Sequence, residues 1–319
     1  DRRERYRGNR LLVSREREAP LNGRQASMDR KGILRIIDQA ALEGATTLDL
    51  SYKDIDTLPP EIGKLTELKK LDLRCNQLTS LPAEFAQLLN LEELLLEDNL
   101  FVSFPVEILQ LSNLNKLNLK FNKNLKSLPA QIGQLTQLRA ICLWGSCIAS
   151  LPPEIGRLRN LENLELRENN LEMLPPEIGQ LTSLRQISFW DNRLTSLPEE
   201  IGLLASLETL TLNENQLTSL PSEIGQLTNL RKLYVSDNQL TSLPEEIGQL
   251  TSLESLFVSD NRLNSLPSGI SHMTHLKVLW HKGNPLTSPP LEISEKGIGA
   301  IREWFRTKEN GHEPGGEHP

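Results

Sequence analysis

Cysteine is scarce in this chain of 319 residues, which contains only Cys75, Cys142 and Cys147. No cysteine cluster stands at either end, which argues against a disulfide framework and favours a reducing compartment. The chain also lacks an N-x-[ST] acceptor, a secretory signal pattern and any apolar run of transmembrane length. We therefore expect a cytoplasmic protein with no membrane partner.

Positive charge and catalytic residue sets are also in short supply. The 35 lysines and arginines face 42 acids, and the net charge of −7 argues against affinity for nucleic acid. No nucleophile, base and oxyanion donor form a recognisable set. Cys142 and Cys147 are too few for a zinc site without two further ligands. We expect no enzyme, no cofactor and no bound metal.

Leucine, in contrast, is abundant and follows the pattern L-x-x-L-x-L-x-x-N-x-L-x-x-L-P through residues 45–291. The period is 23 residues throughout, apart from one extra residue between the fourth and fifth copies. This period and pattern predict an α/β fold, the leucine-rich-repeat solenoid, as one elongated domain. The eleven copies begin at Ala45, Leu68, Leu91, Leu114, Leu138, Leu161, Leu184, Leu207, Leu230, Leu253 and Leu276.

The residues of one copy predict the secondary structure of the repeat. Alternation in the eighth copy turns Leu210 and Leu212 inward and Thr211 outward, as in a short strand. Neighbouring copies then pair their strands into a parallel sheet on the concave face, and Asn215 belongs to a ladder of buried amides that satisfy backbone groups. The second half of each copy, such as Pro221 onwards, predicts a short helical turn on the convex face.

The ends of the array need covers, because the last repeats would otherwise expose an apolar cross-section. Apolar spacing predicts an N-terminal capping helix over 28–44, and the segment 292–310 predicts a C-terminal one. The arginine-rich segment 1–27 reads as a disordered basic leader that is not native, or alternatively as a basic arm for membrane or nucleic acid. The tail 311–319 is expected to be disordered.

The repeated string LPxEIGxLTxLxxLxLxxNxL resembles the intracellular leucine-rich repeats of Ras-group proteins and of bacterial Roco proteins over residues 28–310. The ends agree, with Ile36-Ile37-Asp38-Gln39-Ala40 before the repeats and Ser288-Pro289-Pro290 after them. The resemblance implies a recognition module in GTPase-linked signalling. It implies no GTPase activity in this chain, which lacks a G-x-x-x-x-G-K-[ST] phosphate loop.

Large side chains break the polar pattern of the outward strand positions. Two outward columns contain Trp144, Arg167 and Trp190 in one case and Tyr234, Phe257 and Trp280 in the other. Exposed aromatic residues typically mark a contact surface, so we predict a partner-binding site here. We place its centre at Trp144, Arg167 and Trp190, where the guanidinium can stack between two indoles. The alternative is that neighbouring rings merely cover one another across the sheet.

Carboxylates form a second unusual column, at the position directly before the ladder asparagine. Its consecutive members are Glu168, Asp191, Glu214, Asp237 and Asp260. Stacked at about 5 Å, they repel one another and would attract a cationic partner. Turn chemistry is an equally good explanation, because acids suit a strand exit. Calcium fits less well, since its ligands must converge.

Together these features predict a monomeric interaction scaffold that binds a partner protein, one with a basic surface, on its concave face. The alternative class is an exported or cell-surface receptor for a ligand or host molecule, with a structural role. Cell fractionation separates the two, because only the receptor requires export.

Overall fold

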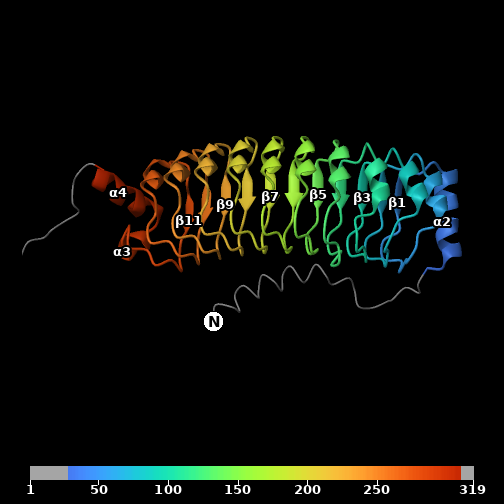
Figure 1. Cartoon of the computed structure of the whole chain (residues 1–319), viewed down its shortest axis with the longest axis horizontal. Coiled ribbons are helices and arrows are strands. Elements are labelled where there is room, and N and C mark those ends of the chain that lie inside the picture. The colour runs from blue at the N-terminus through green and yellow to red at the C-terminus, as the bar shows by residue number, and fades with distance from the viewer. Residues whose placement is uncertain (1–27, 310–319) are drawn as a thin grey trace, which may run out of the picture.

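The computed structural model describes residues 28–309, so the predicted leader and tail lie outside the described residues. Eleven strands of three residues each form one parallel sheet in this part of the chain, in the order β1 to β11 along the sequence. Figure 1 shows them stacked from one end of a long array to the other. They are β1 (Thr47–Asp49), β2 (Lys70–Asp72), β3 (Glu93–Leu95), β4 (Lys116–Asn118), β5 (Ala140–Cys142), β6 (Asn163–Glu165), β7 (Gln186–Ser188), β8 (Thr209–Thr211), β9 (Lys232–Tyr234), β10 (Ser255–Phe257) and β11 (Val278–Trp280).

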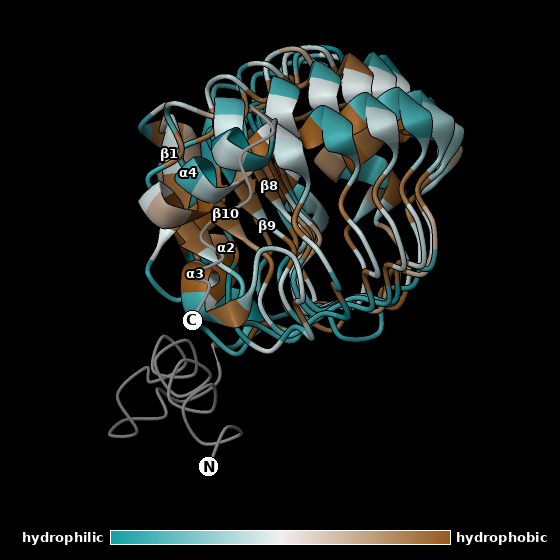
Figure 2. Ribbon diagram, turned by 90° about the vertical axis from the view of Figure 1, so that its left-hand side faces the viewer, coloured by the Kyte–Doolittle hydropathy of each residue, from teal (hydrophilic) through white to brown (hydrophobic). Residues whose placement is uncertain are grey.

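The strand register follows the sequence period, which confirms the leucine-rich-repeat solenoid. Leu210 of β8 pairs with Leu233 of β9, and Leu233 pairs with Leu256 of β10, so equivalent residues lie side by side. These inward leucines are fully buried and join one continuous hydrophobic core. Viewed along the stack, the hydrophobic segments of successive coils superpose (Figure 2). The parallel sheet lines the concave face of the curved array.

Ten turns of 3-10 helix follow strands β1 to β10 and form the convex face. Each follows a proline in extended conformation, which is suited to the residue before a helix. The glycine near the end of most of these turns allows close stacking: a Cβ at Gly179 would lie 2.5 Å from the carbonyl oxygen of Glu200. The turns are η2 (Pro60–Lys64), η3 (Ala83–Gln87), η4 (Val106–Gln110), η5 (Ala130–Gln134), η6 (Pro153–Arg157), η7 (Pro176–Gln180), η8 (Glu199–Leu203), η9 (Ser222–Gln226), η10 (Glu245–Gln249) and η11 (Ser268–His272).

The predicted asparagine ladder is present and links successive repeats. Buried Asn215 donates from Nδ2 to the carbonyl oxygens of Leu212 at 3.0 Å and of Phe189 at 2.8 Å. Its Oδ1 accepts from the Leu194 backbone N–H at 3.0 Å. One amide therefore satisfies groups in two repeats, which would otherwise be buried without a partner at a cost of about 1–3 kcal/mol each.

The ladder is interrupted in the fifth repeat, and the extra residue of the fourth repeat compensates for it. Ser146 stands where repeats two to four and six to eleven have asparagine, and within residues 28–309 its buried Oγ has no hydrogen-bond partner. In the sixth repeat the equivalent Asn169 accepts from the N–H of Ile148. In the fourth repeat Leu125 instead donates to the backbone oxygen of Asn122 at 2.9 Å, within the lengthened turn. The insertion thus supplies the acceptor that the missing amide would have provided.

Helical caps cover both ends of the core, as predicted. At one end α2 (Arg30–Leu42) begins at Asp29, whose carboxylate accepts from the Gly32 N–H at 2.8 Å, and buries Ile33 and Ile37. At the other end lie α3 (Leu291–Ser294) and α4 (Ile298–Glu309) (Figure 1). There Arg302 donates to the carbonyl oxygens of Met273 and Leu276, which ties α4 to the last turn.

Candidate functional site

The concave face is organised in columns that run across the strands, because equivalent residues of successive repeats lie side by side. We call three of them the central column, the exit column and the left-handed column. In the eighth repeat they contain Thr211, Asn213 and Glu214, respectively. The central column ends each strand, and the other two follow after one inward residue.

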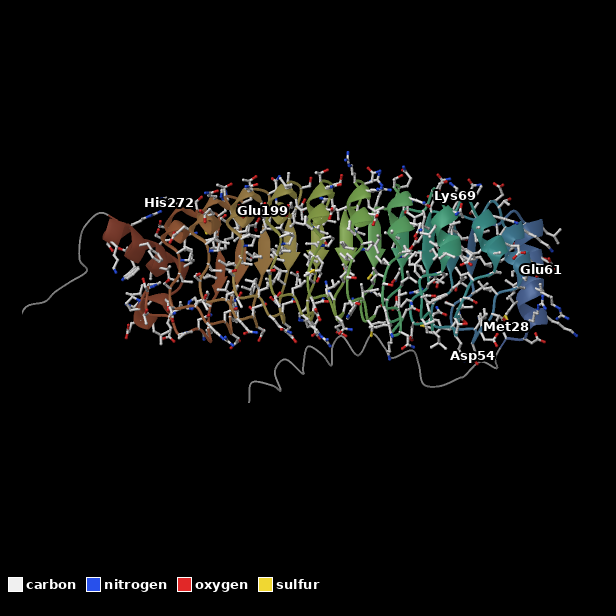
Figure 3. The ribbon with its side chains drawn as sticks, viewed as in Figure 1. Met28, Asp54, Glu61, Lys69, Glu199 and His272 are labelled. Carbon is white, nitrogen blue, oxygen red and sulfur yellow. The ribbon has the colours of Figure 1, made fainter. Side chains whose placement is uncertain are left out.

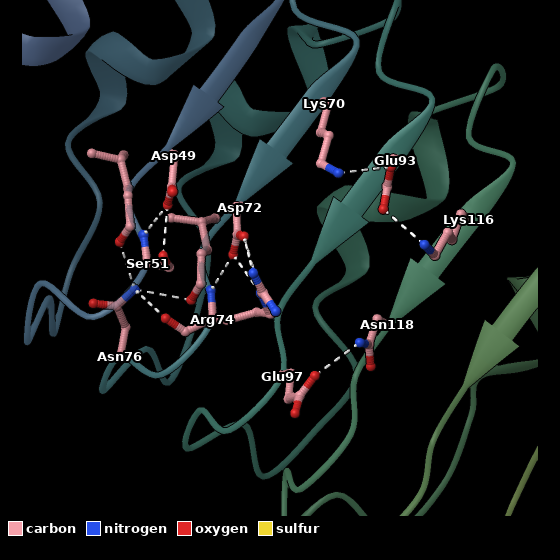
Figure 4. Close-up of polar contacts among 12 residues, drawn as sticks. Asp49, Ser51, Lys70, Asp72, Arg74, Asn76, Glu93, Glu97, Lys116 and Asn118 are labelled. Atoms are coloured by element: carbon pink, nitrogen blue, oxygen red, sulfur yellow. Dashed lines mark hydrogen bonds and ion pairs between the residues drawn. The ribbon is translucent and has the colours of Figure 1, made fainter. Parts of the chain in front are cut away.

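Charges in the first repeats are paired with one another. Arg74 donates to the buried carboxylate of Asp72 at 2.6 Å, and Lys116 lies 2.9 Å from Glu93. Glu97 accepts from Asn118 at 3.1 Å (Figure 4). Because these groups satisfy each other, this half of the concave face presents little free charge to a partner.

Ion pairs also follow the margin just before the strands, where basic and acidic residues alternate. Lys69, at this margin in Figure 3, lies 3.2 Å from Glu92. Arg185 and Glu208 are 2.5 Å apart, and they line a shallow polar cleft of about 500 Å³. Since the charges of the cleft alternate and pair, it offers no net charge for binding.

The prediction of an exposed anchor at Trp144 is wrong, because the side chain is only 6% exposed. Phe121 covers the indole, with ring centroids 5.2 Å apart, and Lys120 and Arg167 lie 5.1 and 5.8 Å from its centroid. Gly145 makes room for this packing, since a Cβ there would meet Phe121 at 2.5 Å. Trp144 is a packed residue between repeats, and its buried Nε1 has no hydrogen-bond partner among residues 28–309.

The predicted stack of Arg167 between two indoles is only partly formed. Arg167 lies over Trp144, and its Nε donates to Ser188 Oγ at 3.0 Å. Trp190 is partly exposed and turns its Nε1 to Glu214, at 3.1 Å from Oε1. The two tryptophans thus belong to separate contacts, and they do not form one exposed anchor.

The most exposed aromatic surface of the concave face lies further along, in repeats nine to eleven. Tyr234 and Phe257 stack with ring centroids 4.6 Å apart and planes 16° apart, and Phe257 stacks on Trp280 at 6.2 Å and 23°. The sheet register places these residues side by side at the ends of β9, β10 and β11. Trp280 is 57% exposed. We call these three rings the aromatic ladder; they cover one another in part and still leave a large indole surface open.

Backbone geometry explains why acids are tolerated in the left-handed column. Every non-glycine residue of this column has a positive φ, between 49° and 57°, and the fifth and eleventh repeats have glycine there. Aspartate tolerates this conformation better than most residues, so turn chemistry accounts for part of the acidic pattern. It does not account for Glu168 or Glu214, whose longer side chains gain no such advantage.

The acids beside the aromatic ladder form no ion pairs in the described part of the chain. Within residues 28–309, no ion pair joins Glu214, Asp237 or Asp260 to a lysine or arginine, in contrast to Glu93 and Glu208. Partial burial, and then the charges of Asp260 and Glu214, raise the pKa of Asp237 to about 6. This end of the left-handed column is therefore a region of uncompensated negative charge.

Two serines complete this region and were not predicted as part of it. Ser236 and Ser259 occupy the exit column between the aromatic ladder and the carboxylates, and both are more than nine-tenths buried. Other repeats place Arg74, Lys120 or Trp190 at the same position. The sequence does contain a signal for these serines: in repeats nine and ten the exit column changes from larger side chains to serine, directly beside the aromatic residues.

Metal and thiol chemistry find little support in the described residues. No group of three or more histidines, cysteines or acids within 28–309 is placed to hold a metal ion. All three cysteines are free. Burial and the neighbouring Glu165 raise the pKa of Cys142 to about 12, so its thiol stays protonated and unreactive at neutral pH.

The repeated coils, the parallel concave sheet and the asparagine ladder define a leucine-rich-repeat protein. Matches to the family described as "Leucine-rich repeat region" cover residues 46–142, 120–189 and 177–279, and the chain belongs to this family. No curated protein matches the chain significantly. In the described part of the chain, no helix is both long and apolar enough to span a bilayer.

Solved structures with the same fold include plant receptors. The plant peptide hormone receptor RGFR1, solved in complex with RGF2, is 30% identical, with a TM-score of 0.65 over 76% of this chain and 45% of its own. The Arabidopsis receptor kinase HAESA, solved with the peptide hormone IDA and the co-receptor SERK1, is 27% identical, with a TM-score of 0.63 over 77% and 47%. The chain thus spans about half the length of these receptors. The Toll–Spatzle complex of Drosophila, at 23% identity and a TM-score of 0.69 over 82% and 36%, shares the fold alone.

Proposed function

We propose that the protein is a recognition module that binds a partner protein on the concave face of repeats nine to eleven. The observation that carries this proposal is the aromatic ladder, whose terminal Trp280 is 57% exposed beside uncompensated carboxylates. Exposed aromatic side chains dominate the energies of protein interfaces. A large aromatic side chain that is exposed outside the core typically marks a binding surface.

The partner should carry a basic surface, because Asp237 and Asp260 have no cation of their own within the described residues. Steering by these charges would raise the association rate, and added salt would lower it. The peptide hormone receptor RGFR1 was solved in complex with RGF2, and HAESA with the peptide hormone IDA, which supports a peptide-binding role for this fold. We propose that the chain itself remains a monomer.

We propose a cytoplasmic location, supported by three free cysteines and by the absence of N-x-[ST] acceptors from the sequence. A role in GTPase-linked signalling rests on the resemblance of the repeats to Ras-group and Roco proteins. Fractionation of cells that express the protein tests the location. Recovery in the exported fraction would favour the receptor alternative.

Selection of binding peptides tests the proposed site. A random peptide library is selected on the protein, and the binders are measured against Tyr234→Ala and Phe257→Ala, with Asn118→Ala as a matched control in the central column of repeat four. We expect the ladder variants to weaken binding by at least about 2 kcal/mol, as at interface hot spots, and the control to have little effect. Binders that bind the ladder variants as well as the parent would contradict the proposal.

A further inference from the structure

The aromatic ladder and the acids of the left-handed column face a shared strip of small side chains. Ser236 and Ser259 lie between them, at 5% and 8% exposure. In repeats two to eight and eleven the corresponding side chains are larger, and some cover their neighbours, as Lys120 and Arg167 cover Trp144. No such side chain from repeats nine and ten stands between the rings and the carboxylates. A side chain from a partner can therefore touch both.

Ring stacking determines which aromatic surface a partner can reach. The planes of Tyr234, Phe257 and Trp280 are nearly parallel, so each contact covers a face of both rings. The surface that remains open includes the ring edges and the face of Trp280 directed away from Phe257, because β11 is the last strand of the described sheet. Ring edges suit the aliphatic part of a side chain, and an open indole face suits a planar cation.

Charge selects a cationic side chain. Glu214 already accepts a hydrogen bond from Trp190, whereas Asp237 and Asp260 have no ion pair in the described chain. Lys232 and Lys282 are near in sequence, yet neither forms an ion pair with these two carboxylates in residues 28–309. The two aspartates occupy equivalent positions of adjacent repeats, whose backbones lie about 5 Å apart, so one guanidinium with several divergent donors can reach both carboxylates.

We propose that this face recognises an arginine side chain of the partner. Its guanidinium donates to Asp237 and Asp260, and its aliphatic part packs along Phe257 and Trp280. Arginine fits better than lysine, because Asp237 is partly buried and a guanidinium loses its hydration more readily than an ammonium group. This inference rests on the proposed function and specifies the partner residue that the site binds.

Amide NMR titrations with N-acetyl-arginine methylamide test the inference directly, with the citrulline and lysine analogues as matched probes. Citrulline keeps the shape of arginine and removes its charge. We expect saturable shifts around residues 234–260, and about tenfold weaker binding for citrulline and for the double variant Asp237→Asn/Asp260→Asn. Asp98→Asn is the control, because Asp98 has the same backbone conformation, with φ of 52°, and lies away from the ladder.

Equal binding of the arginine and citrulline probes, or full binding by the double aspartate variant, would overturn the inference. The proposed function would then still stand if selected peptides depend on Tyr234 and Phe257. Conversely, an arginine probe that binds here while no selected peptide depends on the ladder would preserve the arginine site and refute the proposed function.

Discussion

Among single residues, Asp237 shows that backbone conformation and charge have separate causes in this fold. Its φ of 56° is shared by the equivalent residues of the other repeats, whatever their side chain. Its raised pKa, about 6, comes from burial first and from Asp260 and Glu214 next. The left-handed backbone conformation is a property of every repeat. The raised pKa of Asp237 is a local effect, because this residue is partly buried and lies between two other acids.

Removing this charge should stabilise the protein at neutral pH. The folded-state pKa of Asp237 lies above the reference value of 3.8, so protonation stabilises the fold, and this contribution is lost as pH rises through about 6. Asp237→Asn should raise the unfolding free energy at pH 7.5 by about 1 kcal/mol, allowing for solvent screening, and by almost nothing near pH 4. Denaturant melts at both values measure this. If the Asp98→Asn control raises the unfolding free energy at pH 7.5 by the same amount, the gain comes from placing asparagine in the turn and not from removing the charge of Asp237.

The sequence pattern places Trp144 and Trp280 at outward positions alike, yet their substitution should cost different amounts of stability. Trp144 is 6% exposed and Trp280 is 57% exposed. Trp144→Ala should lower the unfolding free energy by at least about 2 kcal/mol, because it leaves a cavity between repeats, whereas Trp280→Ala should cost less than about 1 kcal/mol. Equal losses in urea melts would mean that the two rings have the same role.

At the scale of the repeat element, the fourth and fifth copies are coupled by one backbone group. Deleting Asn124 should shorten the turn, so that the Leu125 N–H no longer reaches the backbone oxygen of Asn122, at a cost of about 1–3 kcal/mol. Adding Ser146→Asn should recover most of this, because Oδ1 can then accept as Asn169 does for Ile148. Equilibrium unfolding of the two single variants and the double variant gives the coupling energy. Additive losses would contradict the coupling.

Much of the element structure could be predicted from the sequence, because it depends on contacts that repeat. The inward position of Leu210 and the amide bonds of Asn215 each need only the same residue one repeat away. The burial of Trp144 could not be predicted from alternation. It depends on Phe121, which comes from the previous repeat, and on the missing side chain of Gly145.

In the candidate site, too, the sequence pattern predicts which residues share a column, whereas adjacent side chains decide which of them are exposed. Outward alternation placed Tyr234, Phe257 and Trp280 in one column, and the structure stacks them there. The same pattern predicted that Trp144 is as exposed as these three rings, because alternation does not show that Lys120 and Arg167 extend over the Trp144 ring. Side-chain length in adjacent columns decides which ring remains open.

For the molecule as a whole, the two halves of the concave face differ in chemistry. Pairs such as Asp72 with Arg74 neutralise the first half, whereas repeats nine to eleven combine open aromatic surface with Asp237 and Asp260, which form no ion pair within residues 28–309. Both halves share one continuous core and one sheet. A uniform scaffold therefore carries the proposed binding surface at one end.

Site-specific photo-crosslinking in cells that express the protein tests this central claim most directly. A photoreactive phenylalanine replaces Tyr234 in one variant and Asn118 in another, at the same column position in repeats nine and four. The account predicts a discrete crosslinked partner from position 234 and none from position 118, with competition by an arginine-containing binding peptide. Crosslinking from position 118 to the same extent, or from neither position in a folded protein, would contradict it.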